Sequence, residues 1–159
     1  SLEDAAAIGA VVSESAIEWC RANLPFGRFE RNALAPPLVF YDESFDLVYA
    51  LSVFTHLTAD LQLAWRDEVR RVLRPGGLLL LTTHGQSYVP RLGDDERARF
   101  ERGELVVRWG DVAGTNLCSA YHPEAYLRDT FAGGFDFLEL EAEGARGNPT
   151  QDLVLLRKA

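Results

Sequence analysis

Five stretches of the chain have the length and composition of β-strands. Residues 8–12, 45–51 and 78–83 are almost wholly apolar, and the second and third fit strands that are buried on both faces. Near the C-terminus, residues 135–141 alternate apolar and acidic side chains, and residues 153–156 are again apolar. We expect these last two segments to form an antiparallel pair that closes one edge of a sheet.

Two helices are predicted by apolar residues that recur at helical spacing. One follows Ser13 and the other follows Thr58, both of which are residue types that cap helix N-termini. We expect the second helix to hold Arg74 in its last turn and to end at residues 75–77, Pro-Gly-Gly. Because this helix lies between two apolar strands, the segment predicts a right-handed crossover and a parallel sheet.

The remaining segments predict shorter elements. Residues 29–32 fit a brief strand, and the charged residues 94–102 fit a helix or a loop. Residues 104–109 and 115–121 fit the two strands of a hairpin, and residues 122–131 fit a short helix.

The composition fits one α/β domain that spans residues 1–159. The chain has 159 residues, 47% of them apolar, and a formal net charge of -8 from 16 basic and 24 acidic residues. This acidic balance argues against binding to nucleic acid or to an anionic membrane surface through a basic face. The sequence holds neither an export signal nor an apolar run of the roughly 18 residues that span a bilayer, so we expect a cytoplasmic protein.

Cysteine and histidine spacing gives no metal prediction, and the first residue suggests processing. Cys20 and Cys118 are too few for a disulfide framework or a metal cluster, and the three histidines are far apart in the sequence. The chain begins with Ser1 and contains no methionine. We therefore expect it to be a processed chain or a piece of a longer one.

Four motifs together resemble a known family. They are residues 45–48 (FDLV), 54–57 (FTHL), 73–77 (LRPGG) and the leucine-rich strand that follows. The chain resembles the Rossmann-like, class I S-adenosylmethionine-dependent methyltransferases, in particular those that act on small molecules. The resemblance covers nearly the whole chain. It implies an α/β fold whose sheet is mostly parallel, with an antiparallel C-terminal strand pair and with the family's first strand missing.

The resemblance also implies where the cofactor, S-adenosylmethionine, would bind. In an open parallel sheet, ligands lie beyond the carboxyl ends of the strands. Asn32 and Ala33 fall where the family contacts the adenine, and an amide can hydrogen-bond the ring edge. The end of the next strand, where the methionine portion lies, and the segment after it contribute Ala50, Leu51, Ser52 and Phe54.

Two departures from the family concern the same cofactor. A glycine-rich turn after a first strand does not occur upstream of Gly9. The acidic residue that ends the second strand, and holds the ribose hydroxyls, corresponds to Val11. Valine cannot accept a hydrogen bond, and leaving a buried group unpaired costs about 1 to 3 kcal/mol. We therefore expect the 159-residue chain to bind S-adenosylmethionine weakly or not at all.

The residues expected to act on the methyl acceptor follow from the same resemblance. His56 and His84 are the catalytic candidates, because a base is needed when the acceptor is a hydroxyl or an ammonium group. Tyr88, Tyr121 and His122 are candidate acceptor contacts. The family commonly builds its substrate cap after the fifth strand, which here gives residues 86–121. Two of the histidines also have a structural interpretation, in which His56 fixes the turn between a strand and a helix and His122 caps a helix.

Two other functions remain open at this point. One is a non-catalytic, methyltransferase-like module for binding or assembly, which the missing glycine turn and Val11 favour. The other is an NAD-dependent oxidoreductase, which fits the strand–helix–strand unit but lacks a GxGxxG motif. The leading hypothesis is methyl transfer to a small molecule such as a sugar or another metabolite.

The apolar strands also predict how the sheet behaves without the family's first strand. Residues 8–12 and 45–51 would each lose a neighbour and expose unpaired backbone groups. We expect these strands to pair directly or to be completed by a second chain, so that the isolated chain self-associates or is of low stability.

Overall fold

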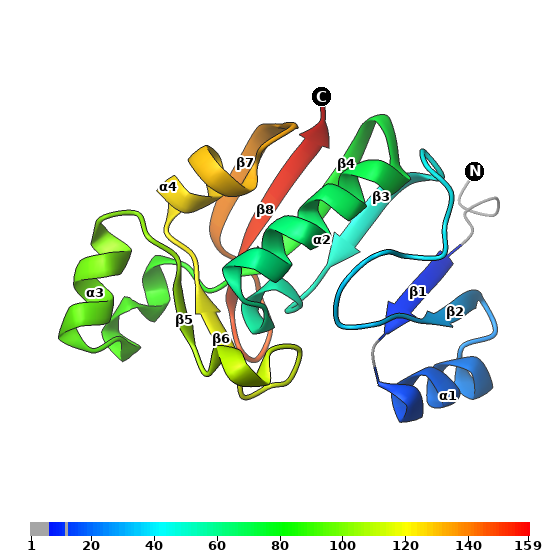
Figure 1. Cartoon of the computed structure of the whole chain (residues 1–159), viewed down its shortest axis with the longest axis horizontal. Coiled ribbons are helices and arrows are strands. Elements are labelled where there is room, and N and C mark those ends of the chain that lie inside the picture. The colour runs from blue at the N-terminus through cyan, green and yellow to red at the C-terminus, as the bar shows by residue number, and fades with distance from the viewer. Residues whose placement is uncertain (1–6, 12) are drawn as a thin grey trace. The chain divides into compact units, whose positions relative to one another are not determined.

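The computed structural model describes residues 7–11 and 13–159 and divides the chain into two compact units (Figure 1). The smaller unit is Ser1–Val39 and the larger unit is Phe40–Ala159. Each is described here by itself.

The smaller unit is a strand–helix–strand motif. Strand β1 (Ala7–Val11) runs parallel to β2 (Gly27–Arg31), and helix α1 (Glu14–Asn23) connects them. The Ser13 hydroxyl accepts the backbone N–H of Ala16 at 3.4 Å and so caps the helix, as its residue type predicted. The predicted strands and helix of this region are confirmed, each within a few residues of its expected bounds.

The larger unit contains a four-stranded mixed sheet in the order β3-β4-β8-β7. Strand β3 (Phe45–Ala50) is parallel to β4 (Leu73–Thr83), whereas β8 (Gln151–Lys158) is antiparallel to both β4 and β7 (Phe135–Ala145). The predicted α/β class and the antiparallel C-terminal pair are therefore confirmed. A mostly parallel sheet is not confirmed, because two of the three ladders are antiparallel.

Strands β1 and β3 belong to different sheets in the described part of the chain. The ladders of residues 7–11 and 13–159 give β3 one neighbour, β4, and give β1 one neighbour, β2. Direct pairing of these two strands, one of the two expected outcomes, stays a prediction, because they belong to separate compact units.

Helix α2 (Ala59–Val72) ends earlier than predicted. Leu73 has extended dihedral angles, and the chain continues from it directly into β4, so Arg74 is not in the last helical turn. A proline disfavours helical geometry at the residue before it, and its ring clashes with the carbonyl group four residues earlier. Pro75 therefore ends the helix before its own position, and Gly76 adopts the positive φ of 76° that the turn requires.

The segment between β4 and α4 (Glu124–Tyr126) carries several short elements. They are η3 (Gln86–Arg91), α3 (Asp94–Glu101), β5 (Val106–Arg108), η4 (Gly110–Val112) and β6 (Ser119–Tyr121). The predicted hairpin is confirmed, since β5 and β6 pair antiparallel. The predicted helix after residue 122 starts as α4 and continues as the π-helical turn η5 (Leu127–Phe131).

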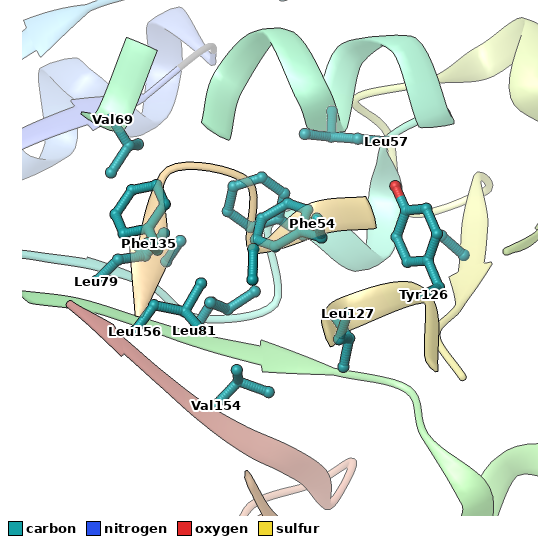
Figure 2. Packing of buried hydrophobic residues seen from close by; sticks show 14 of the residues in the cluster. Phe54, Leu57, Val69, Leu79, Leu81, Tyr126, Leu127, Phe135, Val154 and Leu156 are labelled. Atoms are coloured by element: carbon teal, nitrogen blue, oxygen red, sulfur yellow. The ribbon is translucent and has the colours of Figure 1, made fainter. Parts of the chain in front are cut away.

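The core of the larger unit lies between the sheet and the helical segments α2 and η5 (Figure 2). Leu79, Leu81, Val154 and Leu156 come from the central strands β4 and β8 and are buried. The ring of Phe54 packs edge-on against Phe131, with 5.0 Å between ring centroids. This core fixes the ends of β3 and β4, after which several of the candidate site residues follow. Within the described residues, every helix is too short or too polar to cross a membrane.

Candidate functional site

A pocket of about 350 Å³ in the larger unit brings several predicted site residues together. Five of its nine lining residues come from residues 86–121, and the others follow β3, follow β4 or precede β8. The lining residues are Ser52, His56, His84, Tyr88, Arg91, Asn116, Ser119, Tyr121 and Pro149. A volume of this size is in the usual range of small-molecule sites.

A hydrogen-bond network joins the loop after β3 to β4 and β8. The backbone N–H of Ser52 donates to Thr82 Oγ1 at 2.8 Å, and that hydroxyl donates to Gln151 Oε1. The Gln151 amide nitrogen in turn donates to Ser52 Oγ at 3.0 Å. Ser52 has a φ of 55°, a conformation that costs a non-glycine residue energy. The network holds Ser52 in this conformation and so fixes one residue of the pocket lining.

The same glutamine sets the state of His84. The Gln151 amide nitrogen lies 3.2 Å from His84 Nε2, and an amide nitrogen can only donate. His84 Nε2 must therefore accept, which leaves the ring proton on Nδ1. Burial lowers the pKa of His84 to about 4, against the opposing effect of the Ala120 carbonyl. His84 is accordingly neutral near pH 7, with one nitrogen already engaged.

In His56 the hydrogen-bonded ring nitrogen is Nδ1, whereas in His84 it is Nε2. Its Nδ1 lies 2.8 Å from the backbone carbonyl oxygen of Cys118, which can only accept a hydrogen bond. In the neutral ring the proton is therefore on Nδ1, and Nε2 carries the lone pair. The backbone oxygen of His56 also accepts the N–H of Gly114 at 2.8 Å, so both ends of the residue are fixed to the segment that ends in β6.

An aromatic wall forms the side of the pocket next to His84. The His84 ring stacks on Tyr88 with centroids 4.2 Å apart, and Tyr121 lies 5.6 Å from His84. The Tyr88 hydroxyl donates to the backbone oxygen of Thr150 at 2.6 Å, which holds the ring in place. The guanidinium group of Arg91 lies over the Tyr88 ring at 4.6 Å.

Other predicted site residues lie away from this pocket. Phe54 and Ala50, expected near the cofactor, are buried in the core, and Leu51 is exposed. His122 is also buried beside the ring of Tyr126, and burial lowers its pKa to about 3. Within the described part of the chain, neither of its ring nitrogens has a hydrogen-bond partner. It follows β6 directly and is not among the lining residues.

Asn32 and Ala33, expected near the adenine, lie in the smaller unit. The Asn32 amide nitrogen donates to the Ala33 carbonyl at 2.8 Å, while its buried Oδ1 lacks a partner among the described residues. A free amide oxygen fits the exocyclic amino group of an adenine. Position 11, where an acidic residue would hold the ribose, is valine. The contact of Asn32 with the adenine and the lack of a ribose acceptor at position 11 both stay predictions.

Sequence reasoning missed Gln151 and Arg91. Gln151 lies 67 residues from the histidine that it contacts, and only the antiparallel register of β4 and β8 brings the two together. Arg91 occurs in a segment whose sequence contains several arginines, so its place in the pocket carries no local signal.

Comparison with known proteins places the chain in a family. The family described as "Methyltransferase domain" matches residues 2–81, half of the chain. The probable methyltransferase ltbC of Aspergillus luteorubrus is 30% identical over 110 residues, which are 68% of this chain and 37% of that protein. The chain thus spans little more than a third of the length of this relative.

Two solved structures share the fold. An S-adenosylmethionine-dependent methyltransferase from Mesorhizobium loti is 21% identical, with a TM-score of 0.70 over 96% of this chain and 80% of that one. Another from Methanosarcina mazei is 20% identical, with a TM-score of 0.65 over 95% of this chain and 81% of that one. The predicted family is confirmed. The chain belongs to the methyltransferase domain family.

Proposed function

We propose that the pocket of the larger unit binds a small-molecule methyl acceptor and that His56 takes the proton that the acceptor loses. The observation that carries this proposal is the hydrogen bond from His56 Nδ1 to the Cys118 carbonyl, which leaves the lone pair on Nε2. S-adenosylmethionine supplies an electrophilic methyl group when it is bound. Orientation of the acceptor supplies most of the rate in such a transfer.

His56 and His84 have different roles in this proposal. His84 Nε2 already accepts from Gln151, and its low pKa keeps the ring neutral. We assign proton acceptance to His56 and contact with the acceptor to His84, Tyr88 and Tyr121. Since His122 is buried away from the lining, we assign it a packing role.

Residues 86–121 serve as the substrate cap in this proposal. They contribute Tyr88, Arg91, Asn116, Ser119 and Tyr121 to the lining. The segment is anchored at its base, because the backbone N–H of His122 donates to the His84 carbonyl at 2.7 Å. A cap held in this way excludes water from the acceptor while leaving the sheet unchanged.

The test is a comparison of His56→Gln with His84→Gln at saturating S-adenosylmethionine. S-adenosylhomocysteine formation is followed with a panel of small hydroxylated acceptors. Loss of a general base lowers kcat about 10²- to 10⁴-fold. We expect such a loss for His56→Gln with little change in the affinity for S-adenosylhomocysteine, and a smaller loss for His84→Gln. An unchanged kcat in His56→Gln would contradict the role of His56 as the base.

A non-catalytic module for binding or assembly is the second candidate, and Val11 favours it. Without the ribose partner, the chain could keep the acceptor pocket and lose turnover. Binding of an acceptor with no S-adenosylhomocysteine formation, at any concentration of S-adenosylmethionine, would support this second function.

A further inference from the structure

Arg91 gives the pocket a single permanent charge. Of the nine lining residues, one is an arginine and none is an aspartate or a glutamate. The chain as a whole carries a formal net charge of -8, so an anionic ligand is repelled by most of the surface. A cation in the pocket therefore marks the place where an anion could be held.

The guanidinium group of Arg91 is held in position by the aromatic wall. It lies 4.6 Å from the Tyr88 ring centre, and His84 stacks on the same ring with 4.2 Å between the ring centroids. A stacked guanidinium keeps its N–H groups in its own plane, where they can bind a carboxylate through two parallel hydrogen bonds.

Arg91 has no carboxylate partner among residues 7–11 and 13–159. The contrast is Arg108, which lies over the neighbouring ring of Tyr121 at 5.5 Å and is ion-paired with Glu96. Arg108 holds the pKa of Glu96 down to about 2, so that pair stays charged and occupied at neutral pH. Two arginines thus lie over two tyrosines, and the one that lines the pocket has its N–H groups free for a ligand.

From this arrangement we propose that the methyl acceptor carries a carboxylate that binds Arg91. This inference rests on the proposed function of the pocket and adds the chemical class of its substrate. The carboxylate would orient the acceptor against the Tyr88–Tyr121 wall, with its hydroxyl or amino group toward His56.

The test is binding of a matched pair of probes, 4-hydroxybenzoate and 4-hydroxybenzamide, which differ in charge and share their shape. Both are titrated into the whole chain, followed by NMR, without S-adenosylmethionine. A charge-assisted hydrogen bond contributes about 1.5 to 3 kcal/mol, so we expect the benzoate to bind about 10- to 100-fold more tightly than the amide. Arg91→Gln should remove this preference, and Arg91→Lys should restore part of it.

The matched control is Arg157→Gln, which removes an exposed positive charge, ion-paired with Asp136, near the C-terminal end of β8. It should leave the preference for the benzoate unchanged. Equal binding of the two probes, no saturable binding of either, or equal effects of the two arginine substitutions would overturn the inference. The proposed function fails separately, through an unchanged kcat in His56→Gln or the absence of methyl transfer while the benzoate still binds.

Discussion

The two units of the chain differ most in what they bury. In residues 13–39 the buried apolar side chain is Ile17, whereas the larger unit surrounds a continuous core that includes Phe54, Leu81, Phe131 and Leu156. A two-stranded sheet depends on packing against a helix for stability of its own, and in residues 13–39 that packing buries one apolar side chain. The larger unit, by contrast, has enough buried area to hold loops in strained conformations, and it is there that the acceptor pocket is found.

This difference between the two units predicts that, of the substitutions considered, truncation of Phe54 lowers the free energy of unfolding most. Truncating a buried phenylalanine costs about 3 to 5 kcal/mol, because transfer energy is lost and a cavity remains. We expect Phe54→Ala to lower the free energy of unfolding by this amount in a urea titration. Ile17→Ala is the control, and it should leave the main transition unchanged because it belongs to the other unit. Equal losses in the two variants would show that the units unfold together.

A second test uses the buried histidines of the larger unit. Burial lowers the pKa of His84 to about 4 and that of His122 to about 3, from 6.5 in the unfolded chain. Between pH 6.5 and 4 the unfolded state therefore binds more protons, and stability falls as the pH falls. Each histidine contributes a slope of up to about 1.4 kcal/mol per pH unit.

Urea titrations at pH 7 and pH 5 measure this slope. His122→Gln and His84→Gln should each reduce it, with the two reductions adding up. Burial raises the pKa of Asp152, so this carboxyl works in the opposite direction as the pH falls. A slope that neither substitution changes would contradict the burial of these rings in the folded state.

We expect Gln151→Met to lower the free energy of unfolding by about 1 to 3 kcal/mol. The substitution leaves His84 Nε2 and the Thr82 hydroxyl without their partner. We expect lower stability, together with a shift of the His84 ring nitrogen signals in NMR that reports the changed tautomer balance. Gln86→Met, at an exposed glutamine of the same unit, is the control and should change neither quantity.

The smallest predicted effect concerns the smaller unit and its cofactor contacts. Titration of the chain with S-adenosylhomocysteine should show weak binding, and Val11→Asp should tighten it about tenfold, the equivalent of one hydrogen-bonded pair. Val11→Asn, which offers an uncharged hydrogen-bond acceptor, should increase the affinity for S-adenosylhomocysteine by less than Val11→Asp does. Low-micromolar binding by the unchanged chain would show that the ribose is held by other residues.

Local patterns predicted most of the fold, because strands and helices are encoded by nearby residues. The apolar strand at residues 45–51 and the helix after Thr58 are both present, although that helix ends before Arg74. Pro75 acts on the residues before it, a consequence that apolar spacing alone did not reveal.

The site was predicted less completely than the fold. His56, His84, Tyr88 and Tyr121 were expected near the acceptor, and the structure brings all four to one pocket. Phe54 was expected at the cofactor, which stays a prediction. In the structure its ring packs against Phe131, a contact that depends on a segment 77 residues away. Gln151 could not be foreseen for the same reason, since its contacts depend on how β8 pairs with β4.

Residues 86–121 leave the sheet and return to it at one place, and this arrangement affects how the sequence of the segment could change in evolution. The segment starts and finishes at one point, where the N–H of His122 donates to the carbonyl of His84. A loop closed at its base can be lengthened or exchanged at little entropic cost, about 0.6 kcal/mol for each doubling of length. Most of the pocket lining could therefore be replaced in a single exchange of this segment, provided that the new segment again offers the backbone groups that Cys118 and Gly114 present to His56.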